Sequence, residues 1–178
     1  MSLLALSLSG CVNSEPTDAE TAYDYTVDVP CRGWTYNDTL FFPISVSENP
    51  EIRTPLQRST NYQLGCALRI SSDYQYANVP MLLILQKTDT TNCLGKRPLV
   101  IQNLLRQEIV PQVRDNAGRE LGNTWGSLIQ HETVIDSLSI RFDSVGTYQM
   151  LLIPQSGEIS SIDGVHSVGL SLRPVTNF

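Results

Sequence analysis

Apolar and polar residues alternate with a period of two in separate runs along the chain. Such alternation places the apolar side chains on one face of a strand, so each run predicts a half-buried β-strand. Residues that favour turns, such as Glu48-Asn49-Pro50 and Asp163-Gly164, separate the runs. The predicted strands cover residues 23–29, 40–46, 62–70, 79–85, 109–114, 138–142, 148–152 and 168–172.

Short strands between turns, without a long helical pattern, predict an all-β fold. We expect residues 23–178 to form one antiparallel β-sandwich with jelly-roll or immunoglobulin-like connections. The run at 79–85 is apolar on both faces, which indicates a central strand. Only residues 100–107 have a pattern compatible with a short helix, within an expected excursion from the sheet at 86–107. Pro43 predicts an edge position or a bulge, because proline donates no hydrogen bond to a strand ladder.

Phe142, Gly146 and Tyr148 have the spacing of a hairpin common in sandwich domains. The aromatic residue ends one strand, the glycine supplies the turn conformation, and the tyrosine begins the next strand. We expect the tyrosine hydroxyl to bond back to the loop backbone, which is a structural role.

The N-terminus predicts export and lipidation. Residues 1–10 are uncharged and mostly Leu, Ser and Ala, and they end in Leu8-Ser9-Gly10 before Cys11. This ending matches the bacterial lipobox, although the segment is short and lacks a basic start. We therefore interpret 1–10 as a signal-peptide remnant and Cys11 as an acylated membrane anchor, with residues 11–22 as a polar, flexible tether. Val12, in place of Asp, favours the outer membrane.

Three cysteines remain besides Cys11, so at most one disulfide forms among them. Cys66 lies in the alternating run at 62–70 and is expected to be a small buried residue. Cys31 and Cys93 lie in turn-like stretches and are candidates for a bridge in an exported protein, the alternative being free thiols. The chain has no CxxC motif and no Cys/His pairing, so we expect no zinc site.

Composition and charge narrow the function. The net charge is −6 without a cluster of Lys or Arg, which disfavours nucleic acid as a partner. No apolar run is long enough for a membrane-spanning helix. His131-Glu132 lacks the second histidine of a zinc protease, Gly126-Ser127 lacks a nucleophile elbow, and Ala117 interrupts a calcium-loop pattern. We expect no catalytic residues, no metal and no cofactor.

Several motifs in order resemble the gliding-motility lipoprotein H family (GldH) of the Bacteroidota, over about residues 31–173. The quoted positions are Trp34, Asp38-Thr39-Leu40, Tyr62-Gln63-Leu64, Leu68-Arg69, Tyr74-x-Tyr76-x-Asn78, Met81-Leu82-Leu83, Asp115-x-x-Gly118-Arg119-x-Leu121-Gly122, Trp125-Gly126-Ser127-Leu128, Phe142, Gly146, Tyr148, Ile162, Gly164 and Val168-Gly169-Leu170-Ser171-Leu172. The resemblance implies a cell-envelope lipoprotein associated with gliding motility and type IX secretion. It implies protein partners in that apparatus, and neither an active site nor a cofactor. Residues 86–107 fit the family pattern poorly.

Loop residues are the candidates for partner contacts. Trp125 stands among small polar residues, near Arg119 in sequence, and Trp and Arg dominate interface energetics. Trp34 is the third candidate contact. In the alternative interpretation, the glycines at 118, 122 and 126 supply positive φ and Trp125 caps the end of the sandwich.

Two other function classes stay open. A carbohydrate-binding sandwich would need exposed aromatic residues, for which Trp34, Trp125, Tyr74 and Tyr76 are the candidates, against core and loop packing as their alternative role. A hydrolase on a jelly roll would need two carboxylates in a deep cleft. A non-enzymatic envelope lipoprotein is the reading we favour.

Overall fold

The computed structural model describes residues 21–48, 56–94, 97–155 and 161–175, and of residues 90–94 and 97 it describes the backbone. The described residues form strands and connecting turns, and no helix is present among them. The strands are β1 (Tyr23–Asp28), β2 (Trp34–Thr35), β3 (Leu40–Ser47), β4 (Leu56–Gln57), β5 (Asn61–Ser71), β6 (Met81–Leu94), β7 (Arg97–Ile109), β8 (Asn123–Trp125), β9 (Leu128–Arg141), β10 (Gly146–Pro154), β11 (Ser161–Ile162) and β12 (Val165–Pro174).

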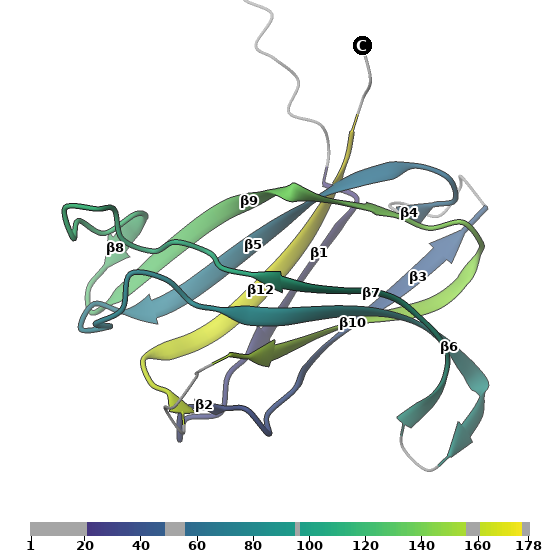
Figure 1. The fold of residues 1–178 in the computed structure, drawn as a ribbon, viewed down its shortest axis with the longest axis horizontal. Coiled ribbons are helices and arrows are strands. Elements are labelled where there is room, and N and C mark those ends of the chain that lie inside the picture. The colour runs from purple at the N-terminus through teal and green to yellow at the C-terminus, as the bar shows by residue number, and fades with distance from the viewer. Residues whose placement is uncertain (1–20, 49–55, 95–96, 156–160, 176–178) are drawn as a thin grey trace, which may run out of the picture.

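Two five-stranded sheets carry the fold (Figure 1). One has the order β1-β12-β5-β9-β8 and the other the order β4-β3-β10-β6-β7, while β11 and β2 form a small separate ladder. All pairings are antiparallel except the short contact between β3 and β4. Most sheet neighbours are far apart in sequence, because the chain passes repeatedly between the sheets. The all-β, antiparallel, sandwich-like fold of one domain is confirmed, whereas residues 1–20, with the signal remnant and most of the tether, lie outside the described residues.

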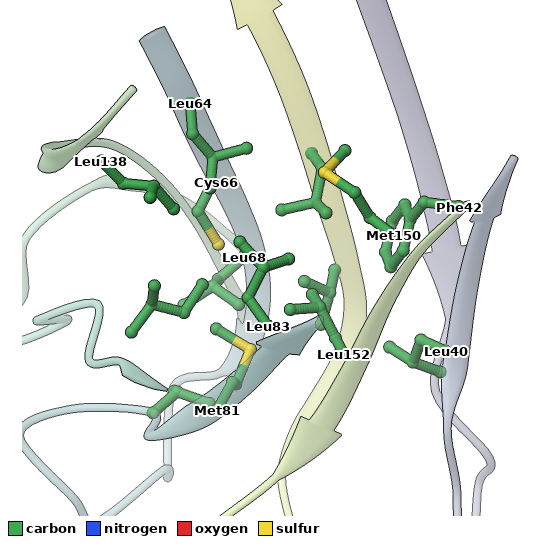
Figure 2. Packing of buried hydrophobic residues seen from close by; sticks show 14 of the residues in the cluster. Leu40, Phe42, Leu64, Cys66, Leu68, Met81, Leu83, Leu138, Met150 and Leu152 are labelled. Carbon is green, nitrogen blue, oxygen red and sulfur yellow. The ribbon is translucent and has the colours of Figure 1, made fainter. Parts of the chain in front are cut away.

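The core lies between the two sheets, as the alternation predicts. β5 buries Tyr62, Leu64, Cys66, Leu68 and Ile70 in succession and turns the intervening residues outward. Figure 2 shows its side chains pointing toward those that β6, β10 and β3 contribute from the opposite sheet. Each such large aliphatic or aromatic side chain contributes about 1.5–3 kcal/mol when fully buried, so the alternating pattern accounts for the pairing of the sheets.

Seven of the eight predicted strands are present, several with longer bounds. The expected strand at 109–114 is wrong: β7 ends at Ile109, and beyond it only Gln112 and Arg114 form isolated bridges. Pro111, which follows Val110, has no N–H to continue a ladder.

The expected helix at 100–107 and the expected excursion at 86–107 are also wrong. This segment belongs to the β6–β7 hairpin, and β6 stays paired with β10 as far as Thr88. Only the end of the hairpin projects beyond the sheet (Figure 1). The β6–β7 pairing skips Ile101 and Leu104, which are extra residues on β7, so the strand carries two bulges.

The edge prediction for Pro43 is confirmed. β4 pairs with β3 only at Val46 and Ser47, so among the described residues no strand lies on the outer side of β3 at Pro43. The hairpin prediction holds as well. The Tyr148 hydroxyl donates to the Ser144 carbonyl at 2.6 Å, its ring contacts Phe142 edge to face, and Gly146 has a φ of 135°.

Candidate functional site

Asp115 organises the turn that follows β7. One carboxylate oxygen accepts hydrogen bonds from the backbone N–H groups of Ala117 and Arg119, each at 2.9 Å. The other accepts from the Arg119 guanidinium at 2.7 Å. The bonds from Arg119, backbone first and then side chain, hold the pKa of this carboxyl below its ordinary value. The Arg119 side chain is nevertheless 82% exposed, so its remaining donors face solvent.

Trp125 follows this turn in sequence, and its strand β8 (Asn123–Trp125) lies at the end of the molecule away from the tip of the β6–β7 hairpin (Figure 1). Trp125 ends β8, which pairs with the start of β9, and Gly126 in the connecting turn has a φ of 62°. The side chain is 73% exposed. The role of a cap on the sandwich is therefore wrong for Trp125, whereas the predicted positive φ is found at Gly118, Gly122 and Gly126. The partner-contact role of Trp125 and Arg119 stays a prediction.

The predicted partner-contact role of Trp34 is wrong, because its side chain is fully buried. Its indole N–H donates to the Asp38 carbonyl at 2.9 Å, and Asp38 in turn accepts from both the backbone and the hydroxyl of Thr35. The residue belongs to the core and offers no contact surface to a partner.

The aromatic platform considered for sugars is not formed by its four candidate residues. Tyr74 is buried like Trp34, and its hydroxyl donates to the Asn78 carbonyl at 3.0 Å. Burial raises the pKa of Tyr74 to about 12. Tyr76 is exposed and lies edge to face against Tyr74. Only Tyr76 and Trp125 of the four reach solvent.

His131 lies buried on β9, close to the backbone of Gln112 and Leu121, which flank the Asp115 turn. Burial lowers its pKa, while the nearby backbone of Leu121 and Gln112 acts in the opposite direction. Its Nε2 atom has no hydrogen-bond partner. In the described part of the chain, no cluster of His, Cys, Asp and Glu is arranged to hold a metal ion, and no helix long and apolar enough to cross a membrane was found.

The cysteines separate into two cases. Cys66 is buried as predicted, and burial raises the pKa of its thiol to about 12. Cys31 is an exposed free thiol. Because the Cys31 thiol is free, the predicted Cys31–Cys93 bridge is not formed in this structure, and the side chain of Cys93 lies outside the described residues.

Sequence reasoning did not find a groove on the outer face of the β4-β3-β10-β6-β7 sheet. It has a volume of about 950 Å³, within the size range of small-molecule sites. Phe41 and Pro43 of β3 line one side, and Pro98 and Val100 of β7 line another. Five strands from distant parts of the chain, β1, β3, β6, β7 and β10, contribute to it, and no local sequence signal marks their meeting.

The chain was compared with solved structures, with curated proteins and with protein-family models. The solved structures include "The Structure of Tomato Aspermy Virus by X-Ray Crystallography", at 11% identity, 97% of this chain, 89% of that chain and a TM-score of 0.30. They also include the structure of the infectious bursal disease virus Gx strain, at 11% identity. That match covers 100% of this chain and 39% of that chain, with a TM-score of 0.29. A third is a cowpea mosaic virus empty virus-like particle, at 10% identity. That match covers 94% of this chain and 86% of that chain, with a TM-score of 0.30. Likenesses with such low TM-scores carry no argument about this chain.

A search of curated proteins gives no match. The family comparison is decisive, because the model of the GldH lipoprotein family matches residues 21–172, which is most of the chain. The chain belongs to the GldH lipoprotein family.

Proposed function

We propose that this protein is a non-enzymatic lipoprotein of the cell envelope and an accessory or structural component of an assembly associated with gliding motility and type IX secretion. Membership in the GldH lipoprotein family supports a motility-associated, lipid-anchored protein, and that family is not known as a family of enzymes. In this proposal the lipid on Cys11 anchors the chain in the outer membrane, and the sandwich faces the periplasm and binds protein partners.

The exposure of Trp125 is the observation that carries the partner-binding part of the proposal. A tryptophan that is 73% exposed leaves a large apolar surface in water, and such residues are typical anchors of protein interfaces. Arg119 adds a guanidinium whose Nε is held by Asp115 and whose side chain stays exposed. Holding the fork in place lowers the entropy that binding would cost.

The test combines genetics with pull-down. Deletion of the gene should abolish surface motility or impair secretion in a gliding host, and complementation should restore it. Trp125→Ala and Arg119→Ala should lose co-purification of motility or secretion proteins while the protein level stays the same. Tyr36→Ala is the matched control, because Tyr36 is another exposed aromatic residue, 64% exposed, outside the 115–128 turn. Equal loss in the control, or full motility in the deletion strain, would refute the proposal.

A further inference from the structure

The β6–β7 hairpin contributes one side of the groove on the outer face of the β4-β3-β10-β6-β7 sheet. The two extra residues of β7, Ile101 and Leu104, interrupt its register with β6. Bulges bend a strand and re-aim its side chains, and they are frequent beside binding sites. Here Pro98 and Val100, near the projecting end of β7, line the same groove as Phe41 and Pro43 of β3. The result is a trough with one wall from each side of the sheet.

Two amide side chains, Gln149 and Gln86, line the floor of this trough, and Asn103, outside its lining, continues the same hydrogen-bonded row. Gln149 of β10 donates from Nε2 to Oε1 of Gln86 on β6 at 2.8 Å, and Gln86 donates to Oδ1 of Asn103 on β7 at 2.7 Å. Each amide is oriented by its neighbour. Because an amide has two donor hydrogens and an acceptor oxygen with two lone pairs, each keeps capacity for a ligand. Thr147 beside the row donates to the Thr88 carbonyl at 2.8 Å and is fixed in the same way.

The described residues that line the groove include no charged side chain, in a chain whose net charge is −6. Two of them, Tyr25 and Phe41, present aromatic rings that are 43% and 44% exposed. Oriented amides and hydroxyls beside exposed rings suit a neutral ligand that has both hydroxyl groups and apolar C–H faces. A charged ligand would find no counter-charge among these described lining residues.

We propose that this groove binds a neutral oligosaccharide chain, a function beyond the protein-partner role proposed above. The sugar rings lie against Phe41 and Tyr25, and their hydroxyl or acetamido groups bond to Gln149 and Gln86, which Asn103 helps to orient. An extended peptide fits less well. Peptides that join a sheet pair with an open strand edge, and here Pro43 removes a donor from β3 while the bulges break the regular edge of β7.

The experiment titrates the full chain, purified in detergent, with uncharged hexasaccharides and follows binding by calorimetry. The probes are cellohexaose, maltohexaose and the hexamer of N-acetylglucosamine, and an uncharged hexapeptide of threonine and leucine represents the peptide alternative. We expect at least one hexasaccharide to bind. Gln86→Leu, which removes two bonds of the row, should weaken that binding by roughly tenfold or more. Val100→Arg, which places a charge in the wall, should weaken it as well.

Gln130→Leu is the matched control, because Gln130 is an exposed amide on β9 in the other sheet. It should bind the sugar like the unmodified protein. Circular dichroism melts of every variant show whether a loss of binding reflects unfolding. Binding of none of the hexasaccharides, binding of the peptide alone, or sugar binding that survives both Gln86→Leu and Val100→Arg in folded protein would overturn the proposal. Loss of the partner contacts at Trp125 would leave this result unchanged.

Discussion

Two tryptophans show how far the surroundings of a residue decide its role. Trp34 is fully enclosed in the core, whereas Trp125 is largely in water. Trp34→Ala should lower the free energy of unfolding by about 3–5 kcal/mol, because it removes a large buried ring and leaves a cavity. Trp125→Ala should change it by less than about 0.5 kcal/mol. Urea unfolding of both variants measures the difference, and a large loss in Trp125→Ala would contradict a contact role for that residue.

Gly122 and Gly118 form a second pair of contrasting residues. Both have positive φ, at 142° and 78°, but a Cβ on Gly122 would lie 2.5 Å from the Gln130 carbonyl oxygen, while nothing lies within 4 Å of one on Gly118. Gly122→Ala should therefore cost clearly more stability than Gly118→Ala, where backbone strain of order 1 kcal/mol acts alone. Melting temperatures of the two variants test this. Equal shifts would mean that the backbone at Gly122 moves away without cost.

At the scale of elements, the segment after β7 lies over β9 and its buried His131. The pKa of this histidine is lowered by burial, so the unfolded chain takes up its proton at a higher pH than the folded chain does. The stabilising contribution is present above the ordinary histidine pKa of about 6.5 and declines as the pH falls through it. We expect the urea midpoint to decrease from about pH 7.5 to about pH 5.5.

Two variants test whether His131 causes this pH dependence of stability. His131→Gln should flatten the dependence on pH, and His166→Gln, at the other histidine, should leave it in place. A slope that persists in His131→Gln would show that some other group titrates.

The elements that sequence predicts well are those whose alternation is unbroken. β3, β5 and β10 keep strict alternation, and their bounds were predicted to within a few residues. β7 was mistaken for a helix, because its bulges insert Ile101 and Leu104 and thus space apolar residues at 100, 101, 104 and 105 in a helix-like pattern. For Trp125, the small polar neighbours leave two roles open, a partner contact and a cap, and its exposure is seen only in the structure. The groove was not identifiable from the sequence, since its lining comes from five strands, β1, β3, β6, β7 and β10, that meet only in the folded chain.

At the scale of the whole molecule, anchoring and folding are separable. The core is contained in the described residues after position 20, and the predicted anchor at Cys11 lies outside them. Cys11→Ser should therefore leave a folded, soluble domain and abolish membrane retention, because the acyl chains that hold the protein are lost. Fractionation with palmitate labelling measures both outcomes. A variant that still sediments with membranes would show that anchoring has another source.

The irregular edges of β3 and β7 affect how copies of this protein would associate if they were anchored to one membrane. A protein confined to a bilayer by its N-terminus meets its own copies at far higher local concentration than the same protein in free solution. Straight, regular edge strands with open N–H and C=O groups would then pair with those of neighbouring molecules and form extended sheets. Pro43 on one edge and the two bulges on the other deny such copies a template. Pro43 and the bulges therefore disfavour edge-to-edge association through this sheet among copies held on a membrane.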